Sequence, residues 1–246
     1  MMIEADGHRV EYETIPGDPV IVFLHEGLGS VAMWKDFPRR LAEAAHCGAL
    51  IYSRYGYGRS EPLGAPRTPD YMHREAQSAL PELLRKLEID RPILFGHSDG
   101  ASIALIHAAT HPVRGAIVLA PHLFVEEVSL DGIREIQRTY DSGDLRKKLA
   151  RYHEDPDSAF RGWSDIWLHP DFRSWNIENL LPAIASPLLA IQGIDDQYGS
   201  MEHLDRIALN VPRAELLRLA NCRHSPHLDQ PDALIEASTR FISGLD

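Results

Sequence analysis

The sequence has no run of apolar residues long enough to cross a membrane as a helix. Its longest apolar stretches, such as Val20–Leu24, have the length of a strand, whereas a membrane helix needs about 20 apolar residues. The N-terminal segment Met-Met-Ile-Glu-Ala-Asp-Gly also lacks the basic region and the apolar run of a signal peptide. We therefore expect a soluble protein located in the cytoplasm.

Cysteine and basic residues are scarce as well. The two cysteines, Cys47 and Cys222, match no metal-ligand spacing and are expected to be free thiols. The 25 Lys and Arg residues are outnumbered by 36 Asp and Glu residues, so the formal net charge is −11. Because nucleic acids and anionic membranes attract basic surfaces, neither is an expected partner. The expected partner is a small-molecule substrate, and the oligomeric state is unknown from the sequence.

What the chain does contain is a regular alternation of strand-like and helix-like segments. Strand-length apolar runs, typical of strands buried on both faces, are Val20–Leu24, Ala49–Tyr52, Pro92–Phe95, Ala116–Leu119, Pro187–Ile191 and Ala214–Leu217. Helical patterns between them are His73–Leu87, Ala101–Thr110, Met201–Leu209 and Pro231–Ile242. This alternation predicts an α/β protein whose mostly parallel central sheet has helices on both faces. The alternating segment Arg9–Ile15 is expected to be an antiparallel edge strand.

The alternation is interrupted between residues 122 and 182. This stretch has helical patches but no convincing strand, and it holds three of the four tryptophans, Trp163, Trp167 and Trp175. We expect a helical cap or lid over the carboxyl end of the sheet, with Trp163 and Trp167 as candidate substrate contacts. Alternatively, the aromatics only attach a helical layer to the core. The core would comprise residues 1–121 and 183–246.

The sharpest motif is Gly96-His97-Ser98-Asp99-Gly100, between a predicted strand and a predicted helix. It has the Gly-x-Ser-x-Gly form of a nucleophile elbow, in which the serine occupies a strained turn. A serine hydroxyl needs a base, which in turn needs an orienting acid. Asp196 follows the strand that ends at Ile191, and His224 precedes the last helix. Both positions fall at the sheet edge where open α/β folds build their sites.

Across nearly its whole length the chain resembles the α/β-hydrolase superfamily, in particular its small capped esterases. The family's Gly-x-x-Asp after a strand is matched by Gly193–Asp196, which favours Asp196 over Asp195 as the acid of a catalytic triad. The resemblance implies an α/β-hydrolase fold and a serine hydrolase with Ser98 as the nucleophile. It also implies that no metal and no organic cofactor is required.

The family's Gly-His before the last helix is matched only in part. Arg223 stands where glycine is usual, and the histidine that follows it is His224. His224 is the predicted base, and His227 is the rival.

Acyl transfer also needs backbone N–H groups that stabilise the oxyanion, each worth about 3 kcal/mol. We predict the amide of Asp99 as one donor. The second donor should come from the loop His25-Glu26-Gly27-Leu28, where the family usually has His-Gly-x but this chain has Glu26 before Gly27. We predict Gly27 as this donor and keep Leu28 as the alternative. Glu26 and Leu28 are also candidate substrate contacts.

The side chain of Asp99 places a carboxylate beside the nucleophile. At about 7 Å and an effective dielectric of about 20, two like charges repel by about 2 kcal/mol. Either the carboxylate points away or pairs with an arginine, or it holds a cationic group of the substrate together with Glu26. The Ser-Asp-Gly form is similar to that of the valacyclovir-hydrolase branch, which acts on α-amino-acid esters. This resemblance suggests a preference for an ester that carries an ammonium group.

The sequence thus predicts hydrolysis of a small carboxylic ester through an acyl-enzyme. The alternative is a carbon–carbon bond hydrolase of the meta-cleavage type, which would have the same triad and cap. A ligand receptor on a hydrolase scaffold is a further alternative. The sequence does not choose among ester, lactone, thioester and carbon–carbon bonds.

Overall fold

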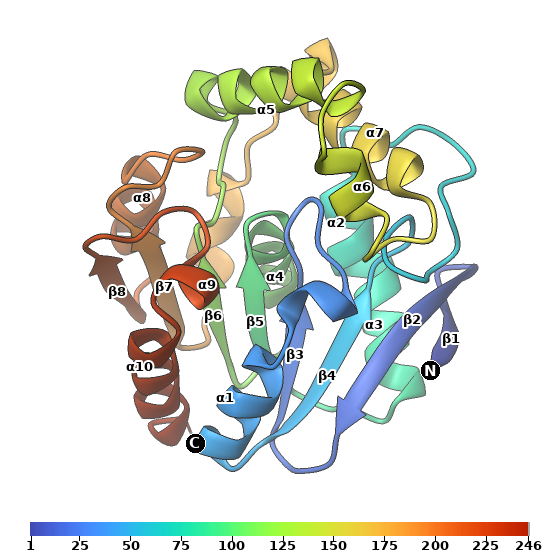
Figure 1. Ribbon diagram of the computed structural model, residues 1–246. Coiled ribbons are helices and arrows are strands. Elements are labelled where there is room, and N and C mark those ends of the chain that lie inside the picture. The colour runs from blue at the N-terminus through green and yellow to red at the C-terminus, as the bar shows by residue number, and fades with distance from the viewer. Residues whose placement is uncertain (246) are drawn as a thin grey trace.

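The computed structural model describes residues 1–245 and contains one eight-stranded sheet. The strands are β1 (Met2–Ala5), β2 (His8–Ile15), β3 (Val20–Leu24), β4 (Gly48–Ser53), β5 (Ile93–His97), β6 (Gly115–Leu119), β7 (Leu188–Gly193) and β8 (Ala214–Leu219). Their order across the sheet is β1-β2-β4-β3-β5-β6-β7-β8 (Figure 1). The pairs β1–β2 and β2–β4 are antiparallel, and all the other pairs are parallel.

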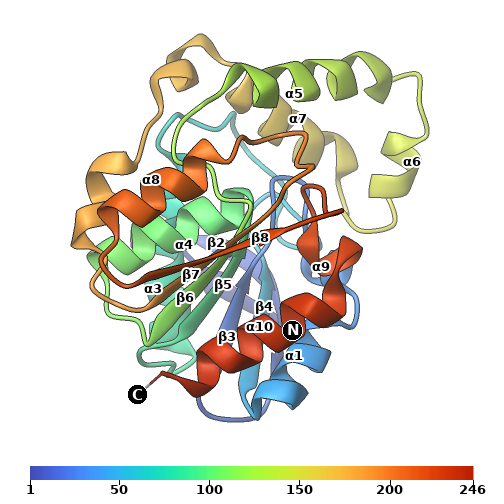
Figure 2. The same ribbon diagram turned by 90° about the vertical axis from the view of Figure 1, so that its left-hand side faces the viewer.

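Helices cover both faces of this sheet. The α-helices of the core are α1 (Phe37–Ala45), α2 (Tyr71–Arg74), α3 (Leu80–Lys86), α4 (Asp99–Thr110), α8 (Glu202–Asn210), α9 (Pro226–Asp229) and α10 (Pro231–Ser243). Two short segments accompany them, η1 (Val31–Trp34) and the π-helical η2 (Glu75–Ala79). Helices α1 and α10 lie on one face, and α3, α4 and α8 lie on the other (Figure 2). The predicted parallel sheet with helices on both faces is confirmed.

The central strands are apolar throughout because both of their faces are buried. Successive side chains of a strand point to opposite faces, so Ile21 and Phe23 pack with α1 and α10. Val22 and Leu24 of the same strand pack into the core under α3 and α4. Burial on two sides explains why these strands show no polar alternation.

The predicted edge strand Arg9–Ile15 is antiparallel but does not form the edge of the sheet. It corresponds to β2, and β1 pairs outside it in a register that places Ala5 opposite His8. The two residues between them, Asp6 and Gly7, both have positive φ, at 52° and 78°. Asp-Gly with positive φ at both positions is the preferred turn of a tight hairpin. The prediction missed β1 because it overlooked this turn.

The segment between β6 and β7 contains α5 (Glu127–Tyr140), α6 (Leu145–Leu149), α7 (Pro156–Trp167), η3 (Pro170–Ser174) and η4 (Glu178–Ala183). Helices α5, α6 and α7 lie above the carboxyl ends of the parallel strands (Figures 1 and 2). By contrast, η4 packs against α4 and α8 in the core layer. None of the described helices is long and apolar enough to span a membrane.

Candidate active site

Ser98 lies on a sharp turn between β5 and α4. Its φ is 53° and its ψ is −118°, a strained conformation for a residue other than glycine. A Cβ atom at Gly96 would overlap the backbone of Gly100, and a Cβ at Gly100 would overlap the carbonyl of Leu24. Glycine at both positions therefore lets β3, β5 and α4 approach closely behind the serine, which fixes the direction of its hydroxyl.

The structure brings Ser98, His224 and Asp196 together. Nε2 of His224 lies 3.0 Å from Oγ of Ser98, and Nδ1 lies 2.9 Å and 3.0 Å from the two oxygens of Asp196. Because the carboxylate can only accept, Nδ1 of His224 carries the proton and the lone pair of Nε2 faces the serine. This is the arrangement in which an imidazole can remove the proton of a serine hydroxyl.

Asp196 is held as an anion by several donors. The backbone N–H of Tyr198 donates to its Oδ1 at 2.9 Å, and Nε2 of Gln192 donates to its Oδ2 at 3.1 Å. Burial raises the pKa of Asp196, but the hydrogen bonds from His224 and Tyr198 and the charge of His224 lower it, so its pKa lies below the ordinary value.

The two rival residues lie elsewhere. Asp195 is exposed to solvent. His227 is buried beside Trp34 and Phe37, and burial together with His97 lowers its pKa to about 3. The geometry therefore selects Asp196 and His224 as the residues that line up with Ser98.

Three residues on the cavity wall around Ser98, namely Asp99, Gly27 and Leu28, have backbone N–H groups that are candidate oxyanion donors. The N–H of Asp99 is the first of α4 and has no acceptor within the helix. On the opposite side, the loop after β3 forms a turn in which the N–H of Gly29 donates to the carbonyl of Glu26 at 3.1 Å. Among the described residues, the backbone N–H groups of Gly27 and Leu28 donate to no protein atom, so both candidate donors remain available.

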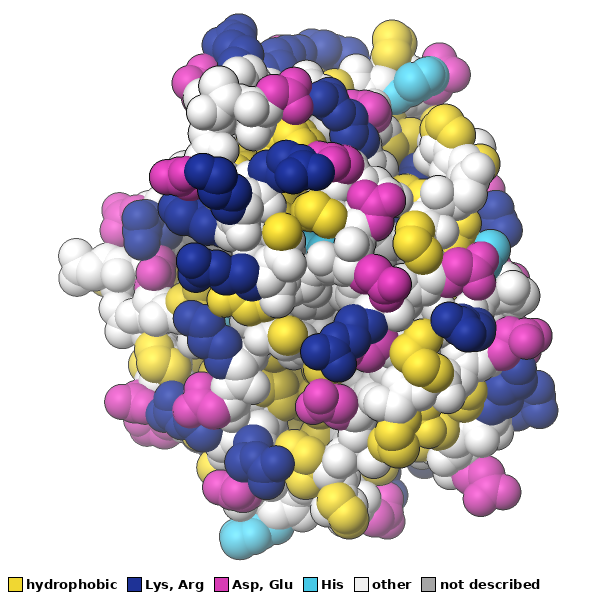
Figure 3. Space-filling view, turned by 45° about the vertical axis from the view of Figure 1, so that its right-hand side comes forward, with side chains coloured by type: hydrophobic (Ala, Val, Ile, Leu, Met, Phe, Trp, Pro, Cys, Tyr) yellow, Lys and Arg dark blue, Asp and Glu magenta, His cyan; other side chains and the backbone are white. Residues whose placement is uncertain are grey.

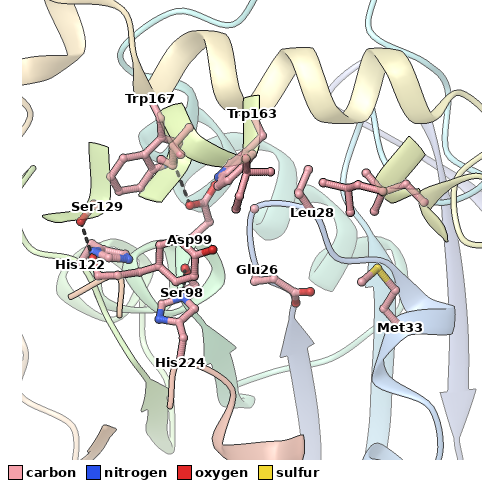
Figure 4. Close-up of a pocket in the computed structure, with 16 residues that line it drawn as sticks. Glu26, Leu28, Met33, Ser98, Asp99, His122, Ser129, Trp163, Trp167 and His224 are labelled. Carbon is pink, nitrogen blue, oxygen red and sulfur yellow. Dashed lines mark hydrogen bonds between the residues drawn. The ribbon is translucent and has the colours of Figure 1, made fainter. Parts of the chain in front are cut away.

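A cavity of about 250 Å³ opens over Ser98 and His224. All five predicted substrate contacts, Glu26, Leu28, Asp99, Trp163 and Trp167, lie on its wall (Figure 4). The remaining lining residues are Gly27, Met33, His122, Ser129, Ile133, Ile136, Leu145, Leu149 and Tyr198. The wall is thus mainly apolar and is contributed by both the core loops and the helices α5, α6 and α7.

Asp99 is fully buried, and protein groups bind both of its oxygens. The hydroxyl of Tyr71 donates to Oδ2 at 2.7 Å, and Nε1 of Trp167 donates to Oδ1 at 3.2 Å. Nη2 of Arg54 lies 4.0 Å from Oδ2. The structure therefore shows the pairing with an arginine that would offset the repulsion expected beside the nucleophile, and Asp99 is also one of the residues that line the cavity.

The prediction from sequence missed His122, whose ring borders the cavity. Burial, followed by His203 and His224, lowers its pKa well below the usual value, so the ring is neutral near pH 7. His122 lies just after β6, so the rule that pointed to Asp196 and His224 could also have found it. Ile133, Ile136 and Leu145 carried no comparable signal. Within residues 1–245, no group of His, Cys, Asp or Glu side chains is arranged to hold a metal ion.

Comparison with known proteins assigns this chain to a family. Residues 21–237 match the model of the Alpha/beta hydrolase family. The chain therefore belongs to the Alpha/beta hydrolase family, and the predicted fold is confirmed. Among curated relatives, it is 27% identical to human Serine hydrolase BPHL over 98% of this chain and 85% of the relative. It is 21% identical to the 2-hydroxy-6-oxo-6-phenylhexa-2,4-dienoate hydrolase of Burkholderia cepacia over 91% of this chain and 87% of the relative.

Solved structures show the same fold at lower sequence identity. The enol-lactonase from Burkholderia xenovorans LB400 superposes with a TM-score of 0.80 at 18% identity, over 99% of this chain and all of that one. A thermophilic esterase from Thermogutta terrifontis superposes with a TM-score of 0.80 at 16% identity, over 99% and 98%. These solved structures show the fold alone. The family match and the curated relatives identify the protein as a hydrolase without specifying its substrate.

Proposed function

We propose that the protein is a serine hydrolase that cleaves a small carboxylic ester. The observation that carries this proposal is the hydrogen-bonded series from Ser98 through His224 to Asp196 at the base of a mainly apolar cavity. The similarity to Serine hydrolase BPHL supports the same class of nucleophile.

The proposed reaction follows from the roles of these groups. His224 takes the proton of Ser98 as the serine oxygen attacks the acyl carbonyl, and Asp196 stabilises the imidazolium that forms. The N–H groups of Asp99 and Gly27 stabilise the oxyanion. The alcohol then leaves with the proton from His224, and water attacks the acyl-enzyme with His224 again as the base.

The charges around the cavity favour an ester over the carbon–carbon alternative. The meta-cleavage relative is named for a dienoate, which is an anion. Here the described cavity wall includes the acidic residues Glu26 and Asp99 and no Lys or Arg. The cation nearest to Asp99, Arg54, does not line the cavity. The carboxylate of Glu26 turns toward His97. Asp99 is therefore the acidic residue of the wall that opposes an anionic substrate and favours a cationic or neutral one.

The first experiment measures hydrolysis of a short p-nitrophenyl ester by the natural protein and by Ser98→Ala. We expect the substitution to lower kcat at least about a thousandfold, because the nucleophile is lost. Asp196→Asn should also lower kcat by up to about ten-thousandfold, because the wrong tautomer of His224 would face the serine. The matched control is Asp195→Asn, which alters the exposed neighbour. If the folded natural protein cleaves a vinylogous diketone but no ester, the carbon–carbon alternative replaces this proposal.

We further propose that Asp99 favours substrates carrying an ammonium group. The test compares kcat/KM for an amino-acid ester and for a neutral ester of equal size. In Asp99→Asn the ratio of the two values should fall roughly threefold to tenfold, since the attraction is partly offset by Arg54. The ratio cancels any general loss caused by disturbing Tyr71 or Trp167. An unchanged ratio in Asp99→Asn would show that the carboxylate has only a structural role.

A further inference from the structure

Glu26 occupies the position where the resemblance leads one to expect glycine, and its main chain is held rigidly. Its carbonyl accepts hydrogen bonds from Nδ1 of His25 at 2.7 Å, from Nη2 of Arg54 at 2.9 Å and from the N–H of Gly29 at 3.1 Å. The side chain of Glu26 is therefore presented from a fixed point in the loop that also carries Gly27.

The carboxylate of Glu26 faces His97, the residue before the nucleophile. Oε2 of Glu26 lies 3.5 Å from Nδ1 of His97, whose side chain is 1% exposed. No other described protein atom pairs with this Nδ1. At 3.5 Å the contact is longer than an ordinary N–H···O hydrogen bond, so its main component is electrostatic.

The other ring nitrogen of His97 contacts the backbone of the proposed base. Nε2 of His97 lies 2.7 Å from the carbonyl oxygen of His224. Because a carbonyl can only accept, Nε2 must carry a proton. In a neutral ring the lone pair of Nδ1 would then point at the carboxylate of Glu26, which is unfavourable. A second proton on Nδ1 removes this conflict by making the ring an imidazolium.

The surroundings of the pair are consistent with this charge distribution. Burial raises the pKa of Glu26, but His97, followed by His227 and His25, lowers it well below the ordinary value. The titratable side chains that face the pair come from three other elements: His25 at the end of β3, His224 after β8, and His227 on α9. Glu26 is the only acid among these groups, so its carboxylate is the one negative charge among them that faces the ring of His97.

We propose that Glu26 and His97 form a partly buried ion pair that positions His224 through its main chain. The pair joins three segments that must be aligned for catalysis: the loop after β3, the nucleophile turn after β5 and the loop that carries His224. Both residues are positioning residues, since neither contacts Ser98 in the triad. This inference rests on the proposed function only in so far as it concerns the rate of ester hydrolysis.

The first test is the protonation of His97, observed by ¹⁵N NMR of the histidine side chains at pH 7. Signals of His97 are assigned by their loss in His97→Asn. We expect both ring nitrogens of His97 to be protonated in the natural protein, and Nδ1 to lose its proton in Glu26→Gln. Glu126→Gln is the matched control, because it disrupts a different buried Glu–His pair and should leave the His97 signals unchanged. An unprotonated Nδ1 in the natural protein would overturn the proposal.

The second test is steady-state hydrolysis of the p-nitrophenyl ester. Glu26→Ala removes the contact between residue 26 and His97. We expect kcat to fall roughly tenfold to hundredfold, because His224 would be misplaced, and KM to stay within about twofold of the natural value. Glu26→Gln can still donate to Nδ1 and should restore part of kcat. A change in KM with kcat unchanged would contradict a positioning role. Equal kcat values for Glu26→Gln and Glu26→Ala would contradict it as well. If the natural protein hydrolyses no ester, the proposed function fails, while the NMR result still decides whether the ion pair exists.

Discussion

Gly27 lies where the loop after β3 packs against α7. A Cβ atom at this position would overlap the indole of Trp163, which projects from α7 onto the loop. The indole ring of Trp163 therefore occupies the space that the side chain of a larger residue would need. Gly27 does not have a positive φ, so its backbone conformation does not require glycine. Glycine is needed here because of its small size.

We predict that Gly27→Ala lowers kcat for ester hydrolysis by about tenfold or more. The added methyl group would push the loop or the indole away, and displacing an oxyanion donor costs up to about 3 kcal/mol. The matched control is Gly27→Ala combined with Trp163→Ala, which removes the overlapping ring. The double variant should have a higher kcat than Gly27→Ala alone. Equal or lower activity of the double variant would exclude this steric explanation.

Glu126 attaches the start of α5 to the core. Its carboxylate accepts hydrogen bonds from the N–H of Ser200 at 2.9 Å, from the hydroxyl of Ser200 at 2.6 Å and from Nε2 of His203 at 2.8 Å. On the other side of the ring, Nδ1 of His203 accepts from the N–H of Leu123 at 3.2 Å. The segment that leads into α5 is therefore bound to α8 and to the loop before it.

This attachment predicts a stability that depends on pH. Burial raises the pKa of Glu126, but the bonds from His203 and Ser200 lower it from 4.5 to about 2. Because the folded pKa is depressed, the ionised group stabilises the protein above pH of about 4.5. This contribution is lost as the pH falls toward 2. Glu126→Gln should lower the free energy of unfolding by about 2 kcal/mol at pH 7, and the difference should shrink below pH 4.5.

Urea unfolding at pH 7 and at pH 3 measures this difference. Glu127→Gln is the control, because the neighbouring carboxylate is 54% exposed and its ion pairs with Arg134 and Arg173 lie at the surface. Ion pairs at the surface contribute little to stability, so this control should change the free energy of unfolding by less than about 1 kcal/mol. Equal effects of the two substitutions at pH 7 would contradict the attachment by Glu126.

At the scale of the whole molecule, the chain has a negative net charge, but acidic side chains do not gather in one place on the face drawn in Figure 3. Acidic and basic side chains lie near one another over much of the face drawn in Figure 3. The formal charge of −11 therefore makes no concentrated acidic patch on that face. The proposed preference for a cationic substrate depends instead on Asp99, which lines the cavity next to Ser98.

Much of the fold and part of the site could be predicted from the sequence because they depend on local signals. Buried parallel strands require continuous apolar runs, so β3 to β7 were found within one or two residues of their ends. The nucleophile turn requires glycine on both sides of Ser98, since the backbones of β3, β5 and α4 meet there. Open α/β folds build their sites at the carboxyl ends of the strands, and this rule pointed to Asp196 and His224.

Only the tertiary structure decided which distant groups meet. The partners of the Asp99 carboxylate are Arg54, Tyr71 and Trp167. No local pattern in the sequence predicts the direction in which this carboxylate points. The contact between Glu26 and His97 likewise joins the ends of two neighbouring strands. The sequence by itself determined the elements and the chemistry of the proposed nucleophile. The folded chain decided the charge and shape of the cavity, because these depend on side-chain directions and on how α5, α6 and α7 pack over the sheet.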